Sequence, residues 1–147
     1  NIVGSWELPN NSLTLGNSYT EARSAISADP EHALEYGGYY NYCAASAATV
    51  CSQTQANASQ DICPKGWRLP TLNEMSGITS YTSAFSPVLS GYYVNGTLSG
   101  TGSYGNWWSA TASSSGNQYI LSYKGSSLYP SDDYKLYGFS VRCIRTI

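Results

Sequence analysis

Four cysteines constrain the possible folds of this 147-residue chain more than any other feature. Cys43, Cys51, Cys63 and Cys143 form an even set without a CxxC pair, and the single histidine, His32, leaves no second imidazole to complete a zinc site. Two disulfides are therefore the simplest interpretation. Of the three possible pairings we favour Cys43 with Cys51 and Cys63 with Cys143, while the residues alone leave the other two open. Because disulfides persist in oxidising surroundings, we expect an exported protein.

The composition excludes several classes of protein. Seven Lys and Arg against nine Asp and Glu leave no basic surplus to neutralise a phosphate backbone, so we do not expect a nucleic-acid binder. No apolar run approaches the roughly 18 residues that a membrane-spanning helix needs. One histidine and few carboxylates leave little scope for a catalytic acid/base pair, and we predict a protein that is not an enzyme and holds neither cofactor nor metal.

Local patterns in the first half predict short helices. Residues 20–26 look helical with Thr20 as N-cap, and residues 29–37 do so with an Asp cap, Pro30 at the first helical position and a terminal glycine. Residues 39–43 are typical of a strand, and residues 44–60 of an irregular loop. We therefore divide the chain into an N-terminal extension with short helices, residues 1–37, and a domain over residues 38–147.

The middle of the chain carries a clear helix start. Thr71 and Glu74 form a capping box, which predicts a helix that ends near Gly77 or Ile78. Just before it, residues 64–66 predict a turn that leads into a buried pair, Trp67 and Leu69.

The second half is punctuated by glycine and predicts an antiparallel sheet. The last strand-like segment alternates apolar Phe139, Val141 and Cys143 with polar residues, which places the cysteine on the apolar face. A helical first half followed by a β-rich second half predicts an α+β fold. The strand-like segments are residues 92–94, 106–110, 118–123 and 138–144.

Three blocks of sequence resemble a known family. They are DICPKGWRLPT at residues 61–71, GNWWSAT at 105–111 and YGFSVRC at 137–143. In this order they are similar to the Fibrobacter succinogenes major paralogous domain of bacterial cell-surface proteins, which is related to the C-type lectin-like and formylglycine-generating-enzyme folds. The resemblance implies a C-type lectin-like domain over residues 38–147, with short helices around a twisted antiparallel sheet and a long loop region in its second half. It also implies that Cys63 pairs with Cys143.

The resemblance further implies where a ligand binds. In related folds the aromatic and polar residues between the Trp-rich strand and the last strand make the contacts, and tyrosine and tryptophan supply large contact areas at low entropic cost. Neighbours on a strand point to opposite faces, so we expect one of the two adjacent tryptophans in the core and the other in solvent as the best binding candidate. The predicted ligand-binding residues are Tyr104, Trp107, Trp108, Asn117, Tyr119, Tyr123, Tyr129, Asp132, Asp133, Tyr134 and Tyr137.

Two chemical activities of the related folds are not expected. Calcium sites of true C-type lectins need several oxygen ligands, and Asp132 and Asp133 lack the flanking amide or carboxylate pair. The formylglycine-generating relatives depend on an active cysteine pair, for which only Cys43 and Cys51 would remain. The three sequons, at Asn10, Asn57 and Asn95, are expected by chance in a chain so rich in Asn, Ser and Thr.

We therefore expect an extracellular module, attached to a bacterial cell surface, that recognises a glycan or a protein on another surface without covalent chemistry. The alternative is a structural subunit or decoration of an extracellular, pilus-like filament, in which the same aromatic face contacts other copies of the chain.

Overall fold

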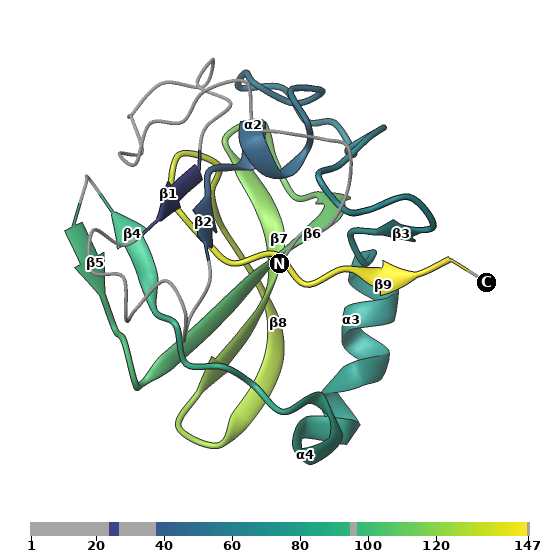
Figure 1. Ribbon diagram of the computed structural model, residues 1–147. Helices are drawn as coiled ribbons and strands as arrows, with labels where there is room; N and C mark the ends of the chain where they lie inside the picture. Colours follow the sequence, from purple (N-terminus) through teal and green to yellow (C-terminus); the bar gives the residue numbers. More distant parts are fainter. Residues whose placement is uncertain (1–23, 27–37, 95–96, 147) are drawn as a thin grey trace.

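The computed structural model describes residues 24–26, 38–94 and 97–146. Over these residues the fold is mixed α/β, with short helices and antiparallel sheets (Figure 1). It contains two disulfides. The bonds join Cys43 to Cys51 and Cys63 to Cys143, so the favoured pairing is confirmed. No helix in this described part is long and apolar enough to cross a membrane.

The main sheet is an antiparallel meander of three strands, β6 (Tyr104–Ala112), β7 (Asn117–Lys124) and β8 (Ser127–Tyr134). Lys124 pairs with Ser127 across a tight turn in which Gly125 has a φ of 70°, a conformation that glycine adopts without a steric penalty. The predicted strands 106–110 and 118–123 are confirmed. The long loop region implied by the resemblance is not found at residues 127–134, because this turn folds β8 back onto β7.

Smaller strands surround the meander. They are β1 (Ser24–Ile26) with β2 (Gly38–Tyr40), β3 (Trp67–Arg68) with β9 (Ile144–Arg145), and β4 (Tyr92–Val94) with β5 (Thr97–Ser99). The predicted strand 92–94 is thus confirmed. The predicted strand 138–144 is wrong as a continuous element, because Gly138, Phe139 and Ser140 make single bridges to three different elements and only Ile144 belongs to β9.

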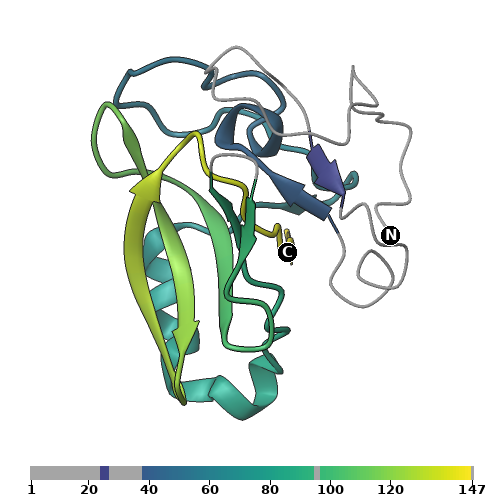
Figure 2. The same ribbon diagram turned by 90° about the vertical axis from the view of Figure 1, so that its left-hand side faces the viewer.

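The helix predicted from the capping box is confirmed. Helix α3 (Leu72–Ile78) ends at one of the two expected residues, and the 3₁₀ turn η1 (Thr79–Tyr81) and helix α4 (Thr82–Phe85) follow it. The Thr71 hydroxyl accepts a hydrogen bond from the Glu74 amide, and the Glu74 carboxylate accepts one from the Thr71 amide at 2.8 Å. Figure 2 shows α3 lying along one side of the meander.

Two other local predictions are wrong in part. The strand expected over residues 39–43 stops at Tyr40, because the Asn41 side chain accepts a hydrogen bond from the Ala44 amide and starts helix α2 (Tyr42–Ala45). The helix expected over residues 20–26 is contradicted at its last three residues, which form β1 and pair with β2. The helix expected over 29–37 and the sequons at Asn10 and Asn95 lie outside the described residues.

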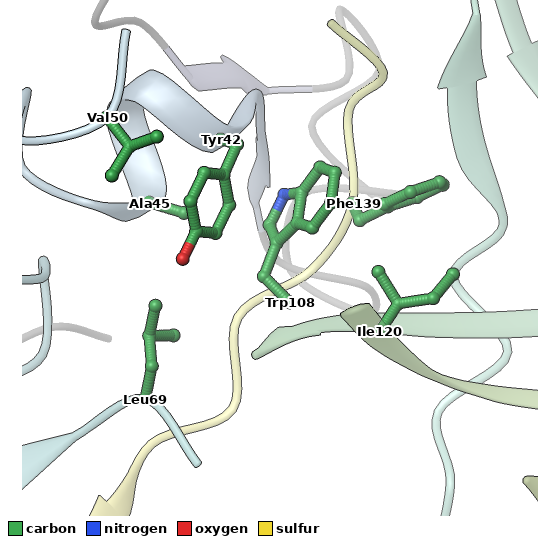
Figure 3. Packing of buried hydrophobic residues seen from close by; sticks show 7 residues of the cluster. All are labelled: Tyr42, Ala45, Val50, Leu69, Trp108, Ile120 and Phe139. Atoms are coloured by element: carbon green, nitrogen blue, oxygen red, sulfur yellow. The ribbon is translucent and has the colours of Figure 1, made fainter. Parts of the chain in front are cut away.

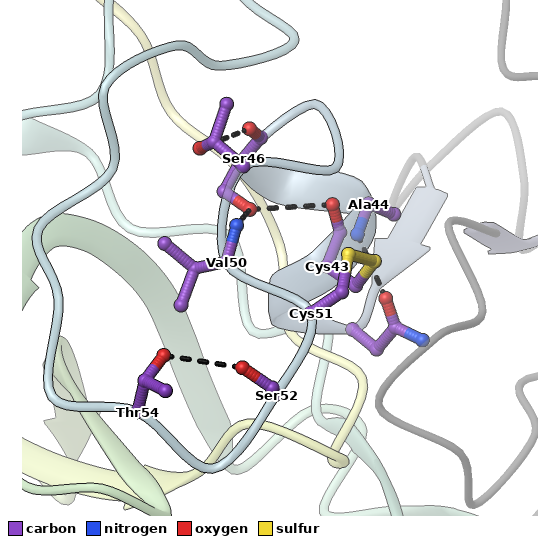
Figure 4. The surroundings of a disulfide bond; sticks show 9 residues. Cys43, Ala44, Ser46, Val50, Cys51, Ser52 and Thr54 are labelled. Atoms are coloured by element: carbon purple, nitrogen blue, oxygen red, sulfur yellow. Dashed lines mark hydrogen bonds between the residues drawn. A yellow bond between two sulfur atoms is a disulfide. The ribbon is translucent and has the colours of Figure 1, made fainter.

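The Cys43–Cys51 disulfide closes a short loop after α2 (Figure 4). Inside the loop, the Ser46 hydroxyl donates to the Cys43 carbonyl and accepts from the Val50 amide. Two alanines, Ala47 and Ala48, have positive φ angles of 48° and 65° there. The irregular loop predicted over residues 44–60 is confirmed for residues 46–60, whereas Ala44 and Ala45 belong to α2.

Buried residues pack on both sides of the meander. On one side, Trp108 and Ile120 pack against Tyr42, Leu69 and Phe139 (Figure 3). The second cluster lies on the other side, beneath α3, and contains Met75, Trp107, Leu121 and Leu128. Burial of Leu69 is thus confirmed, but Trp67 is 47% exposed, because β3 is a two-residue strand that pairs with β9 alone.

Candidate functional site

The strand register assigns the meander residues to two opposite faces. Successive side chains of a strand alternate, and directly paired residues share a face. Trp108, Ile120 and Ser131 are paired across the sheet and therefore lie on one face. We call this side, with Tyr104, Asn106, Ser122, Lys124, Tyr129, Ser131 and Asp133, the groove face, and the side that carries Trp107, Leu121 and Leu128 the helix face.

The groove face holds a polar groove with a volume of about 220 Å³. Ile120 and Phe139, which are buried, supply its apolar part, and Tyr92 from β4 contributes from the neighbouring hairpin. The remaining lining residues carry hydroxyl, amide or charged groups; they are Tyr104, Asn106, Ser122, Lys124, Tyr129, Ser131 and Asp133.

The aromatic rings of the groove are held by edge contacts. The Tyr92 ring lies 6.0 Å from the Tyr104 ring and 6.3 Å from the Phe139 ring, both in T-shaped arrangements. Tyr129 is 39% exposed, so it offers the groove an aromatic surface that solvent can reach. In the groove, the Ser122 hydroxyl donates to the Asn106 side-chain oxygen at 2.6 Å, which fixes the orientation of that amide.

The two charged side chains of the groove belong to opposite ends of the strands. Asp133 is paired with Gln118, six positions along β7 from Lys124, which corresponds to about 20 Å of strand. The Lys124 ammonium nitrogen lies 5.3 Å from the centre of the Tyr104 ring. Burial raises the pKa of Asp133, the hydrogen bond from the Tyr134 amide lowers it, and nearby Asp132 raises it. Among the described residues, no cation forms an ion pair with this carboxylate.

Both tryptophans of the Trp-rich strand are buried. Trp107 is 4% exposed and Trp108 is fully buried, so the expectation that one of them faces solvent is wrong. The two rings do point to opposite faces, but each face is covered at that point. Tyr42 and Phe139 contact Trp108, while Phe85 contacts Trp107 with ring centres 4.9 Å apart.

The remaining predicted site residues are divided between the two sides. Asp132 and Tyr119 are a pair on the helix-face side, at the exposed end of the sheet. There the Asp132 carboxylate accepts hydrogen bonds from Ser113 at 2.9 Å and from Asn117 at 3.0 Å. Tyr123 packs against the cluster under α3. These residues therefore do not join the groove.

Tyr134 and Tyr137 form a ring pair beyond the acidic end of the groove. Their ring centres are 5.4 Å apart, and Tyr137 also contacts Phe139. Burial raises the pKa of Tyr137, and the charge of Asp133 raises it further. Of the predicted residues, the structure thus brings together Tyr104, Tyr129 and Asp133 in the groove, with Tyr137 beside them.

Asp132 and Asp133 do not converge on one cation. As neighbours on β8 they point to opposite faces of the meander, and Asp132 is already hydrogen-bonded to two donors. No group of three or more His, Cys, Asp or Glu that could hold a metal ion occurs within the described residues.

Seven groove residues are absent from the predicted site: the apolar Ile120 and Phe139, and Tyr92, Asn106, Ser122, Lys124 and Ser131. The sequence contains one indication of these residues. The Gly125–Ser126 pair lies between two segments that mix polar and apolar residues, and such a pair is typical of a tight hairpin turn. Once that turn fixes the register of β7 and β8, alternation places Ser122, Lys124 and Ser131 on the same face as Tyr129.

A second, smaller cleft lies between the helices and the sheet. It has a volume of about 100 Å³ and an apolar lining that includes Met75, Phe85, Trp107 and Leu121. Arg142 closes part of it, with its guanidinium 4.0 Å from the centre of the Phe85 ring. This cleft is the seam between the α3–α4 segment and the helix face.

Comparisons with protein-family models, with curated proteins and with solved structures found no match to this chain.

Proposed function

We propose that this protein is an exported recognition module that binds a glycan in the groove of the β6–β8 meander. The observation that carries the proposal is the chemistry of the lining. Tyrosine rings lie beside hydroxyl, amide and carboxylate groups, and such a surface can stack on sugar rings while it hydrogen-bonds sugar hydroxyls. The two disulfides support the part of the proposal that concerns export.

We also propose that the domain is a C-type lectin-like member of the family that its three sequence blocks resemble, attached to a bacterial surface. The Cys63–Cys143 bond supports this, as does the antiparallel meander that follows short helices. The end of the domain returns to its beginning, because Phe139 bridges Tyr40 and β9 pairs with β3.

The groove favours binding without catalysis. General acid/base chemistry needs two groups that reach the same substrate atoms. The titratable residues that line the groove are the tyrosines, Lys124 and Asp133, and the two charged groups are separated by about 20 Å of strand.

The alternative function, a subunit of an extracellular filament, is supported by exposed aromatic residues outside the groove. Trp67, Tyr81 and Tyr134 are 47%, 66% and 53% exposed. Rings of this kind often anchor contacts between proteins. If filaments were the function, the purified domain would form concentration-dependent assemblies in sedimentation experiments, and substitution of these rings would abolish them.

A glycan array with matched variants tests the proposal. We expect the purified domain to bind a restricted set of oligosaccharides and Tyr129→Ala to weaken that binding about tenfold or more, because an exposed ring in the groove is removed. Tyr81→Ala removes a more exposed ring outside the groove and should bind as the wild type does. Absence of binding to every glycan on the array, or an equal loss of affinity in the two variants, would contradict the proposal.

A further inference from the structure

The length of the groove constrains the size of its ligand. The lining of the groove extends from Lys124 on β7 to Asp133 on β8, positions that lie about 20 Å apart along the strands. A single sugar ring cannot contact both ends of such a site. An elongated ligand can, and it would meet a different charge at each end.

The two ends act independently on a ligand. The backbone positions of Lys124 and Asp133 lie about 20 Å apart along the strands, and no ion pair among the described residues joins their side chains. Each charge is therefore available to a nearby group of the ligand.

The end of the groove at Lys124, the cationic end, can bind one anionic group of a ligand. The Lys124 ammonium lies over the Tyr104 ring, and none of the other described residues provides it with a carboxylate partner. The contact with the ring orients the side chain without neutralising its charge. A carboxylate or phosphate placed at this end gains a charge-assisted hydrogen bond that a neutral sugar cannot make.

The other end favours a neutral part of the same ligand. Asp133 is a hydrogen-bond acceptor there, and it suits a donor such as a sugar hydroxyl. Asp132, on the opposite face of the same strand, adds a second negative charge near this end without lining the groove. An anionic group at this end would be repelled, and such repulsion is a source of specificity.

We propose, on the basis of the glycan-binding function above, that the groove selects an oligosaccharide with a single acidic group at one end and neutral hydroxyl-bearing sugars at the other. The acidic group lies at Lys124 and the neutral sugars lie toward Asp133. The groove rejects chains that carry an acid on every ring.

The test uses matched glycans on an array. Each neutral oligosaccharide is printed beside the same chain with one terminal uronate, the same chain with one terminal phosphate, and a chain of equal length with a uronate at every ring. The wild-type domain should bind the singly acidic chains about tenfold more tightly than the neutral parent. It should bind the fully acidic chain more weakly than the singly acidic ones.

Substitutions of single residues test which side chains cause the preference for a singly acidic glycan. Lys124→Gln should abolish the preference for one acid over the neutral parent, whereas Lys124→Arg should keep the preference. Lys65→Gln removes an exposed lysine outside the groove and should change nothing. Asp133→Asn should improve binding of the fully acidic chain, because it removes the repulsive charge.

The outcomes separate this inference from the proposed function. Equal binding of neutral and acidic chains, with binding still lost in Tyr129→Ala, would overturn the charge selection and leave glycan recognition standing. A preference that survives Lys124→Gln would also overturn it. Failure to bind any glycan would refute both. Equal selection of carboxylate and phosphate supports recognition of charge alone, and selection of one of them identifies the acidic group.

Discussion

At the scale of single residues, Asp133 lines the groove and destabilises the fold when it is ionised. Burial raises the pKa of its carboxyl group, so the folded protein binds a proton there more tightly than the unfolded chain does. The contribution of this group to stability is therefore most favourable at low pH and declines as the pH rises through its folded-state pKa. A residue that destabilises the fold when ionised is typical of a site selected for binding.

Thermal unfolding can measure the destabilising effect of the ionised Asp133 carboxylate. Asp133→Asn keeps an acceptor for the Tyr134 amide and removes the charge, so we expect it to raise the melting temperature at pH 7 and to have little effect at about pH 3, where aspartate is largely protonated. Asp132→Asn is the matched control on the opposite face, and it should not stabilise, because that carboxylate is held by Ser113 and Asn117. Equal stabilisation by both variants would show that removal of any negative charge stabilises the protein, and it would contradict a specific effect of burial at Asp133.

The two tryptophans show what alternation alone can and cannot predict. Opposite orientations for Trp107 and Trp108 follow from strand geometry, and the structure has them. Exposure does not follow from it, because it depends on what packs against each face. Met75 and Phe85, from the α3–α4 segment, bury Trp107, while Tyr42 and Phe139 bury Trp108, so neither ring reaches solvent.

At the scale of elements, hydrogen bonds at the first turn of helix α3 anchor this helix beside the helix face of the meander. The Glu74 carboxylate accepts hydrogen bonds from both terminal nitrogens of Arg68, one of them at 2.8 Å, and from the Thr71 amide. The pKa of Glu74 is lowered to about 2, mainly by the hydrogen bonds from Arg68 and to a smaller extent by the hydrogen bond from the Thr71 amide. The charged form of Glu74 therefore stabilises the fold.

The pH dependence of this helix start can be measured. A lowered pKa means that the stabilisation is fully present above the ordinary glutamate pKa near 4.5 and is lost as the pH falls toward 2. Glu74→Gln keeps a side chain that can complete the capping box, so it isolates the charge. We expect it to lower the free energy of unfolding by at most about 1 kcal/mol at pH 7, since both side chains are partly exposed, and to match the wild type near pH 2. A constant difference across this pH range would contradict the explanation.

Elements with a local signal could be predicted, and elements set by distant contacts could not. The capping box of α3 and the turn at residues 64–66 are encoded by neighbouring residues, and both are present in the structure. The strand β8 was missed because Pro130 interrupts its pattern. Proline is tolerated there because, among the described strands, β8 pairs only with β7 and its outer edge needs no ladder donor.

The same edge bears on the filament alternative. A free strand edge can pair with another chain, and Pro130 together with the charges of Asp132 and Asp133 opposes such pairing. A filament of this domain would therefore need side-chain contacts through exposed rings rather than a continuous sheet.

At the scale of the whole molecule, the disulfides and the terminal segment connect parts that are distant in sequence. The Cys63–Cys143 bond spans 80 positions and in the chain-entropy model stabilises the fold by about 4.5 kcal/mol. Phe139, four residues before that bond, packs on Trp108 and also lines the groove. The core is thus continuous with the proposed binding site, which favours a groove that is formed before the ligand arrives.

The groove could be predicted from the sequence only in part, because elements that are distant in sequence contribute to its lining. Tyr104, Tyr129 and Asp133 were predicted from the region they occupy, and the groove unites them. Tyr92 comes from a hairpin outside that region and reaches the groove through contacts with Tyr104 and Phe139. Neither local pattern nor composition encodes such a contact.

The most direct test of the central claim is an NMR titration of the isotope-labelled domain with the glycan that binds best on the array. If the groove is the binding site, the largest shift changes will fall on Tyr92, Asn106, Ser122, Tyr129 and Ser131, and the α3–α4 segment will be unaffected. Shift changes centred on α3 and α4, or on exposed rings such as Tyr81 with none in the groove, would contradict it.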